Sequence, residues 1–247
     1  MRWMMIPWAI GCTASGTTDS QGTTDGQGTG DTDTQPGTTV VELPDVGAAT
    51  FVEGVDNPYF PLPLGATWYY EADTADGLET DDVLVTADVK VINGVNVVVV
   101  LDSVRVDGVL VEETDDWYAQ DSEGNVWYLG EDSCEYENDV CVDTSGSWEW
   151  GVDGALPGII MPANPTVDGQ PYYQEYYAGE AEDAGEVIET GLTITVPAGT
   201  WDDCIRTHDF STLDLGLDEK KDYCPSVGNV FVDEAPSFVE LISTTGL

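Results

Sequence analysis

Two dipeptides, Asn93-Gly94 and Asp107-Gly108, constrain the fold of this chain more than any other feature. Each separates runs in which β-branched residues alternate with other side chains, and this combination is the strongest local signal for a β-hairpin. At least four consecutive antiparallel strands are therefore expected to form a meander. The strand-like runs cover residues 83–92, 95–106, 109–120 and, after a turn at 123–125, 126–130.

Further strand patterns follow along the chain, and no helical periodicity longer than about ten residues interrupts them. These later runs cover residues 172–177, 187–196, 204–210, 229–233 and 238–244. The predicted fold class is all-β, with an antiparallel meander that forms a curved sheet, a half-barrel or a sandwich.

The first residues resemble a bacterial lipoprotein signal peptide. Arg2 is followed by an apolar run over residues 3–10 and then by Gly11 and Cys12, so the cleavage box reads AIGC. A transmembrane helix is not favoured, because it needs about 20 apolar residues. The resemblance implies that residues 1–11 are removed and that Cys12 carries lipid. The alternative is an N-terminus that is not exported and a Cys12 that is buried.

Residues 12–44 combine the lipidated Cys with a linker rich in Thr, Gly and Asp. Ala14 is the only aliphatic side chain between residues 13 and 39, so this segment is expected to be a flexible tether. Its root-mean-square reach is about 30 Å. A single β domain is expected over residues 45–247. Because Cys12 is followed by Thr and not by Asp, similarity to lipoprotein sorting signals favours the outer membrane over the inner membrane.

The other four cysteines form an even set, as expected of an exported protein that contains disulfides. Three pairings are possible. The favoured one joins Cys134 to Cys141 across a short acidic loop and Cys204 to Cys224 between neighbouring strands. Zinc ligation is less favoured because the chain has no CxxC pair.

The charge of the chain excludes several classes of partner. There are 48 Asp and Glu against 6 Lys and Arg, for a net charge of -42. Six scattered cations cannot form the basic stripe that nucleic-acid binding requires, so nucleic acid is excluded as a partner. The same charge repels anionic lipid, which leaves lipid on Cys12 as the expected attachment to a membrane of the cell envelope.

Five long motifs are similar to those of a family of exported bacterial proteins of unknown function. They are VDNPYFPLPLGATWYYE (55–71), DWYAQDSEGNVWYLGE (116–131), SGSWEWGVDGALPGIIMPANP (145–165), QEYYAGEAED (174–183) and VPAGTWDDCIRT (196–207). The resemblance covers most of residues 55–244 and implies no activity. Where members carry His, this chain has Asn164 and Glu180, so a metal or acid–base role of those imidazoles does not carry over. The C-terminal layout is also similar to lipoprotein half-barrels that hold acyl chains.

Acidic residues crowd around the Cys134–Cys141 segment, in a window between Arg105 and Arg206 that has no Lys, Arg or His. Hard cations such as Ca²⁺ bind clustered carboxylates, so a weak Ca²⁺ site is one interpretation. No EF-hand spacing is present, and the favoured alternative is a solvated face adapted to high salt. No other cofactor is expected. The candidate Ca²⁺ ligands are Asp132, Glu135, Glu137 and Asp139.

Aromatic residues follow several predicted strands, often as adjacent Trp-Tyr or Tyr-Tyr pairs. Because neighbouring residues of a strand point to opposite faces, each pair is expected to place one ring in the core and one outside. Outer rings on one concave face would bind a sugar, a lipid or an apolar peptide, and ordinary cross-strand packing is the plainer alternative. The candidate ligand-binding residues are Trp117, Trp127, Tyr128, Trp148, Trp150, Tyr173 and Tyr176.

Paired carboxylates could also serve a carbohydrate-active hydrolase. Asp115, Asp116 and Glu175 lie beside aromatic residues, where the pKa of a carboxyl is expected to be raised. His208, the only imidazole, has no GxSxG serine to activate and is predicted to be structural. No catalytic residue is nominated.

Together these features predict a lipid-anchored protein of the cell envelope whose disulfide-linked β domain binds an apolar or amphipathic ligand without catalysis. The alternatives are a Ca²⁺-dependent structural or adhesion module and a carbohydrate-active hydrolase.

Overall fold

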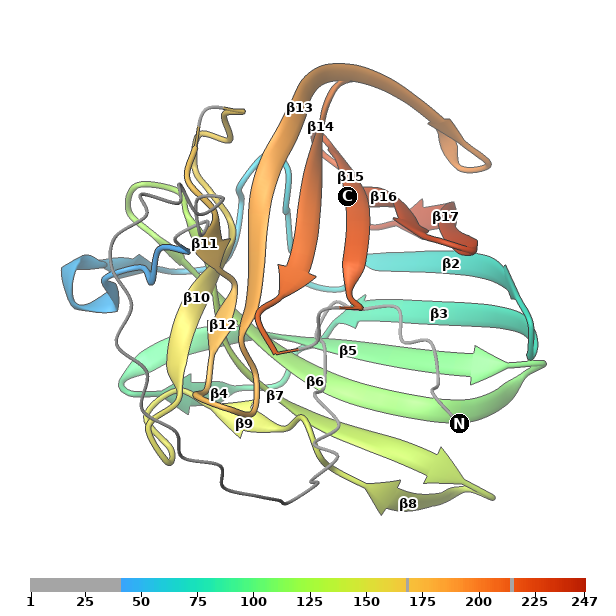
Figure 1. The fold of residues 1–247 in the computed structure, drawn as a ribbon, viewed down its shortest axis with the longest axis horizontal. Helices are drawn as coiled ribbons and strands as arrows, with labels where there is room; N and C mark the ends of the chain where they lie inside the picture. Colours follow the sequence, from blue (N-terminus) through green and yellow to red (C-terminus); the bar gives the residue numbers. More distant parts are fainter. Residues whose placement is uncertain (1–40, 168, 214–215) are drawn as a thin grey trace, which may run out of the picture.

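The computed structural model describes residues 41–167, 169–213 and 216–247. The predicted signal peptide, Cys12 and most of the predicted linker lie outside the described residues. The described chain is almost entirely antiparallel β-sheet, which confirms the predicted fold class (Figure 1). Its helical structure is the short 3-10 helix η1 (Val46–Ala48). In this part of the chain, no helix has the length and apolar character that crossing a membrane requires.

Seventeen strands form one sheet. The first nine are β1 (Phe51–Val52), β2 (Thr67–Thr74), β3 (Gly77–Val85), β4 (Lys90–Ile92), β5 (Val95–Val106), β6 (Val109–Asp121), β7 (Val126–Glu137), β8 (Val140–Asp143) and β9 (Trp148–Glu149). The others are β10 (Leu156–Met161), β11 (Tyr172–Tyr173), β12 (Glu175–Tyr176), β13 (Asp183–Val196), β14 (Gly199–Ser211), β15 (Asp218–Cys224), β16 (Gly228–Glu234) and β17 (Ser237–Thr245).

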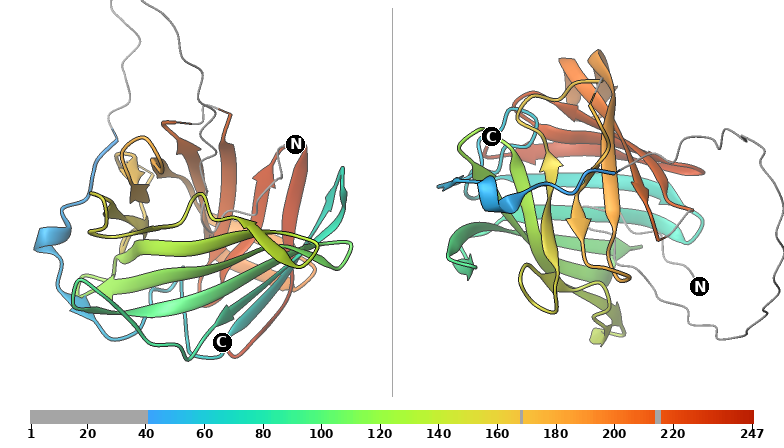
Figure 2. Two further views of the ribbon diagram at one scale, coloured as in Figure 1. Left: turned by 90° about the horizontal axis from the view of Figure 1, so that it is seen from below. Right: turned by 60° about the vertical axis from the view of Figure 1, so that its left-hand side comes forward.

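The sheet nearly closes on itself. Antiparallel pairings run without a break from β13 through β14, β15, β16 and β17 to β2, β3, β5, β6, β7 and β10. The segment from β11 to β12 links the two ends, because Tyr173 pairs with Ala184 of β13 and Glu175 pairs with Pro157 of β10. Figure 2 shows the resulting curvature, which gives the sheet an inner and an outer face.

The predicted meander is present, with one correction. Asn93 and Asp107 adopt positive φ values of 48° and 50°, as the two-residue hairpin turns require. The single strand predicted over residues 83–92 is wrong, because β3 ends at Val85 and β4 begins only at Lys90. The break follows from Thr86, whose hydroxyl accepts a hydrogen bond from the Asp88 N–H at 3.2 Å and turns the chain away from the sheet.

Both favoured disulfides are present. Cys134 and Cys141 have Cα atoms 5.7 Å apart, and Cys204 and Cys224 have Cα atoms 4.2 Å apart. The second bond joins the paired strands β14 and β15, as predicted. The first bond closes the short acidic segment 134–141, as predicted, and this segment is a hairpin formed by the ends of β7 and β8.

Apolar side chains form two clusters, one on each side of the sheet. The larger cluster lies on the inner face and includes Phe60, Trp68 and Val100. The long β13–β14 hairpin, which arches at the top of Figure 1, packs Ile194 against this cluster. The smaller cluster lies on the outer face of β6 and β7, where the segment from η1 to β1 covers it. The sheet therefore buries side chains on both faces in this region.

Candidate functional site

The inner face of the sheet carries a ring of carboxyl groups, which we call the acidic belt. Except for the half-buried Glu112, each of its members is 8% exposed or less. Nine strands contribute to it, so the belt surrounds the interior and does not lie on one edge. Its members are Glu79, Asp81, Asp102, Glu112, Asp116, Glu131, Glu175, Asp183, Asp209, Glu219 and Glu234.

Strand alternation places the belt residues. Neighbouring residues of a strand point to opposite faces, so two adjacent acids in a strand put one carboxyl on the inner face. Asp81 is fully buried in this way, whereas Asp82 beside it is exposed. Six acidic doublets inside strands follow this rule, whereas both acids of the doublet 202–203 in β14 are exposed. The six are 81–82, 112–113, 115–116, 131–132, 218–219 and 233–234.

Like-charge repulsion links the belt residues into a continuous series. The charge of Asp81 raises the pKa of Asp102, and the charge of Asp102 raises the pKa of Asp116. The charge of Asp116 in turn raises the pKa of Glu131. The series continues through Glu175 and Asp183. Between β16 and β3, the charge of Glu234 raises the pKa of Glu79. Ionising any one member therefore makes it harder to ionise its neighbours.

Two pairs of belt carboxyls lie close enough to affect each other's ionisation, Asp81 with Asp102 and Glu175 with Asp183. Ionisation of one member of a pair therefore favours the neutral form of the other. Burial is the largest cause of the shift in all four groups. It raises the pKa of Asp81 to about 7 and that of Asp183 to about 6, and it raises those of Asp102 and Glu175 well above the ordinary value.

Five further belt carboxyls also have raised pKa values. Burial, reinforced by neighbouring acids, raises the pKa of Glu79 to about 7, and burial raises that of Glu112 to about 7. Burial also raises the pKa values of Asp116 and Glu131 well above the ordinary range, and that of Glu219 to about 8. Much of the belt therefore holds protons at neutral pH.

One lysine lies among these acids. The Lys221 ammonium is 2.9 Å from Asp209 Oδ2 and 3.6 Å from Glu219 Oε2, and its side chain is 5% exposed. Burial opposes its charged form, but the two carboxylates outweigh this effect and raise the pKa of Lys221. Within the belt, Asp209 and Glu219 thus stabilise the charged Lys221 ammonium.

Two of the predicted ligand-binding residues contact the belt. The Tyr128 hydroxyl donates a hydrogen bond to Asp116 Oδ1 at 2.7 Å, and the Trp148 Nε1–H donates one to Glu175 Oε2 at 2.7 Å. The Tyr128 and Trp148 rings pack edge to face, with centroids 5.4 Å apart. The raised pKa values predicted for Asp116 and Glu175 are confirmed, and the pKa of Asp115 is also raised, chiefly by burial.

The other predicted aromatic residues do not form a single platform. Trp117 and Trp127 point outward, but they are buried in the smaller cluster, so the expectation of an exposed outer ring is wrong here. Phe51 lies 6.1 Å from Trp127 and 6.2 Å from Trp150, ring centre to ring centre. This covering comes from the N-terminal segment of the domain. Elsewhere, the half-buried Tyr173 and Tyr176 pack against each other at 4.9 Å.

The predicted Ca²⁺ ligands are spread apart. Asp132 is exposed on the outer face of β7, whereas Glu135 lies on the inner face opposite Glu112. Glu137 and Asp139 are exposed near the β7–β8 turn. Across the described ranges, no group of three or more His, Cys, Asp or Glu is arranged to hold a metal ion.

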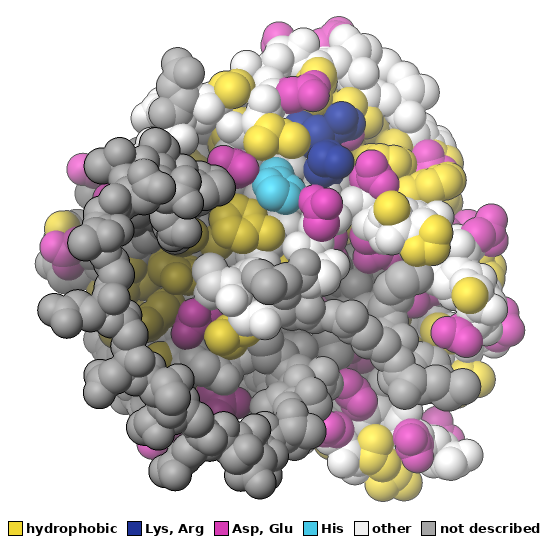
Figure 3. Space-filling model, viewed as in Figure 1, with side chains coloured by type: hydrophobic (Ala, Val, Ile, Leu, Met, Phe, Trp, Pro, Cys, Tyr) yellow, Lys and Arg dark blue, Asp and Glu magenta, His cyan; other side chains and the backbone are white. Residues whose placement is uncertain are grey.

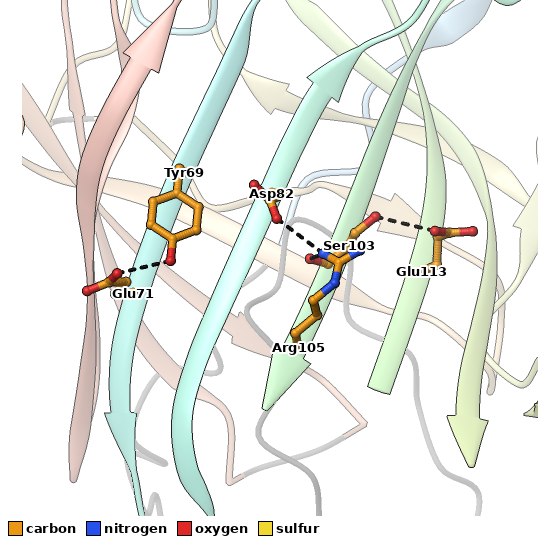
Figure 4. Close-up of polar contacts among 6 residues, drawn as sticks. All are labelled: Tyr69, Glu71, Asp82, Ser103, Arg105 and Glu113. Carbon is orange, nitrogen blue, oxygen red and sulfur yellow. Dashed lines mark hydrogen bonds and ion pairs between the residues drawn. The ribbon is translucent and has the colours of Figure 1, made fainter. Parts of the chain in front are cut away.

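On the outer face, by contrast, carboxylates meet partners near solvent (Figure 4). Asp82 lies 3.1 Å from Arg105, and Glu71 accepts a hydrogen bond from Tyr69 at 3.0 Å. His208 also lies on this face, within 3.1 Å of Glu186 and 3.0 Å of Asp218, which supports a structural role. Figure 3 shows the imidazole beside a patch of Lys and Arg side chains.

Two solved structures are similar to this chain. One is a candidate lipoprotein from Parabacteroides distasonis ATCC 8503, with 17% identity and a TM-score of 0.40. The other is a candidate exported protein with a YmcC-like fold from Bacteroides fragilis NCTC 9343, with 16% identity and a TM-score of 0.45. Each match covers 76% of this chain and 99% of the other. No family model and no curated protein matches the chain, and similarities this distant assign no function.

Proposed function

We propose that this protein is a lipoprotein of the cell envelope whose β domain binds an amphipathic ligand on its inner face. The AIGC box, the Cys12 that follows it and the linker over residues 12–44 support a lipid anchor, with the outer membrane as the favoured location. The two disulfides fit an oxidising compartment outside the cytoplasm.

The observation that carries the binding role is the division of the inner face into an apolar half and an acidic half. Along β3, Glu79 and Asp81 are followed by the buried Val83 and Val85. In the antiparallel neighbours β14, β15 and β16, the acids also share one end. Asp209 pairs with Glu219, and the next strand carries Glu234 at the same level. These valines belong to the larger apolar cluster, so an amphipathic molecule that enters the interior would place its apolar part among them and its polar group against the belt.

The two alternatives have less support. A retaining glycosidase needs carboxyls about 5 Å apart and an inverting one about 6.5–9.5 Å. A glycosidase also needs one carboxyl protonated and the other ionised, whereas the pKa values of both members of the pair Asp81 and Asp102 are raised, chiefly by burial. Calcium would need several oxygens around one point. The predicted ligands Asp132 and Glu135 lie on opposite faces of β7.

Binding is tested with the full chain made soluble by Cys12→Ala. The chain is titrated separately with n-octanol and with n-octylamine, and binding is measured by calorimetry. At least one of these two eight-carbon compounds is expected to bind saturably. Propanol and propylamine serve as matched controls and are expected to bind more weakly, because each buried methylene contributes about 0.8 kcal/mol. Absence of saturable binding by both octyl compounds would contradict the proposed function.

The anchor is tested in cells. Cys12→Ala is expected to move the protein from the membrane fraction to the soluble fraction, because a tether without lipid has no apolar surface to insert. A variant that stays in the membrane fraction at the same level as the wild type would contradict lipidation at Cys12.

A further inference from the structure

We propose that the Cys134–Cys141 disulfide is a thiol-exchange site, at which an external dithiol reduces the bond and releases β8 from the sheet. A thiolate of the dithiol attacks one of the two sulfurs and forms a mixed disulfide, and its second thiolate then breaks this intermediate. The protein gains two electrons and two protons as two cysteine thiols, and the dithiol is oxidised to a disulfide. The proposal concerns the margin of the sheet and does not depend on ligand binding at the inner face.

The first argument is that the two disulfides differ in their access to solvent. Cys204 and Cys224 are both 0% exposed and belong to the larger apolar cluster. By contrast, Cys141 is exposed and Cys134 is half-buried. Exchange requires a thiolate to reach one of the sulfurs, so access decides which bond reacts. An external thiol therefore reaches the Cys134–Cys141 bond and not the Cys204–Cys224 bond.

The second argument is that β8 buries no side chain that would hold it in place. All four of its residues are exposed, and Val140 and Val142 are 61% and 53% exposed. Its register partners lie at the end of β7, and Figure 1 shows the strand at the margin of the sheet. A pair of strands with no buried apolar side chains is marginally stable in water. The disulfide is therefore the main attachment of β8.

The third argument is that charge opposes the pairing of β8 with β7. Glu135 of β7 is directly opposite Asp143 of β8 and, on its other side, opposite Glu112 of β6. Like charges that face each other across strands destabilise a sheet. Burial is the first cause that raises the pKa of Glu135, and the charges of Asp143 and Glu137 follow. The disulfide thus joins two segments that repel each other.

The structure also limits how far the released segment opens. On one side, β7 stays paired with β6 as far as Glu135, which is opposite Glu112. On the other side, the Ser147 hydroxyl accepts a hydrogen bond from the Ser133 N–H at 2.9 Å and donates one to the Ser133 carbonyl at 3.2 Å. Trp148, the next residue, is buried. The segment expected to open is residues 136–146, while the rest of the sheet stays folded.

Selective reduction is tested on the soluble Cys12→Ala chain, whose four cysteines all lie in disulfides. The folded chain is treated with dithiothreitol, the thiols that appear are alkylated, and mass spectrometry identifies them. Cys134 and Cys141 are expected to react at least about tenfold faster than Cys204 and Cys224, because access limits exchange. The same reaction in concentrated urea is the control, and there the two bonds are expected to react at similar rates.

Release of β8 is tested by hydrogen exchange, measured by mass spectrometry before and after this reduction. Amides of residues 136–146 are expected to lose protection, whereas those of β14 and β15 are expected to keep it. The double variant Cys134→Ser with Cys141→Ser is the matched control. It is expected to show the same loss without dithiothreitol and no further change when dithiothreitol is added.

Three results would overturn the proposal. The first is reduction of Cys204–Cys224 as fast as that of Cys134–Cys141 in the folded chain, or reduction of neither bond. The second is unchanged protection of residues 136–146 in both the reduced chain and the double variant, which would show that pairing alone holds β8. The third is loss of protection throughout the domain, which would show that this bond maintains the whole fold.

Discussion

The inner and outer faces of the same strands place the same side chains in opposite environments. Asp81 and Asp82 are adjacent in β3, yet Asp81 is fully buried beside Asp102, whereas the Asp82 side chain is 60% exposed and pairs with Arg105. Burial raises the pKa of Asp81 to about 7. The face of the strand, and not the residue type, thus decides whether a carboxyl is charged. The formal charge of -42 therefore overstates the charge of the folded domain at neutral pH.

The largest difference between the two faces is expected in how the free energy of unfolding depends on pH. Glu79 and Glu112 have pKa values of about 7 in the folded chain and ordinary values when unfolded, so the native state binds more protons. Their contribution to stability is complete below the unfolded pKa and is lost as pH rises through about 7. The free energy of unfolding is expected to fall by at least about 4 kcal/mol between about pH 5 and pH 8. Calorimetry that shows constant or rising stability over this range would contradict the protonated belt.

The next largest effect is expected at the two adjacent lysines of β15. Lys221→Met leaves Asp209 and Glu219 without their cation and is expected to cost about 3–5 kcal/mol at pH 8. At pH 5 the loss is expected to be smaller, because Glu219, with a pKa of about 8, takes a proton. Lys220→Met on the outer face is the matched control, expected within about 0.5 kcal/mol of the parent. Equal losses for the two variants in urea unfolding would remove the distinction between the faces.

A gain of stability is expected from removing an inner carboxyl. Asp81→Asn is expected to stabilise the chain by about 2–4 kcal/mol at pH 8, because the amide keeps the shape of the side chain without the buried charge. At pH 5 the gain is expected to fall to about 1–2 kcal/mol, because Asp81 is then protonated in the folded chain but still ionised in the unfolded chain. Asp82→Asn is the control, with little change at either pH. Destabilisation by Asp81→Asn at pH 8 would show that its ionised form is favoured in the fold.

The smallest effect is expected for the exposed ion pair of the outer face. Arg105→Gln removes the ion pair with Asp82. The Arg105 side chain is 34% exposed and the Asp82 side chain is 60% exposed. Such pairs contribute about 0–1 kcal/mol, and salt weakens them further. Urea unfolding at low and high salt measures this contribution. A loss above about 2 kcal/mol would show that the outer carboxylates are as strongly coupled to folding as the belt.

Local signals predicted much of the fold. The Asn93-Gly94 and Asp107-Gly108 turns set the order of the central strands, because the turn type itself demands residues that tolerate positive φ. The two disulfides followed from an even set of cysteines. A strand was expected at Cys224, but the extent of β15 was not predicted, because its sequence DEKKDYC lacks the apolar alternation of the other strands. Its inward positions carry Glu219 and Lys221, which are buried as an ion pair.

The site was less predictable than the fold. Aromatic neighbours marked Asp116 and Glu175, but the usual expectation that acids lie outside hid the rest of the belt. Acidic doublets inside strands, such as 81–82 and 131–132, are a signal for part of the belt, whereas Glu79, Asp102 and Asp209 have no acidic neighbour in the sequence. The burial of Trp117 and Trp127 depends on a segment far away in the sequence, around Phe51, and had no local signal.

Titration of individual side-chain carboxyls by carbon-13 NMR tests the central claim most directly. With the full Cys12→Ala chain, the carboxyl carbons of Glu79, Asp81 and Glu112 are expected to titrate with midpoints near 7, and that of Glu219 near 8. Midpoints between about 3 and 5 for all four carboxyls, the range of exposed acids, would contradict the account.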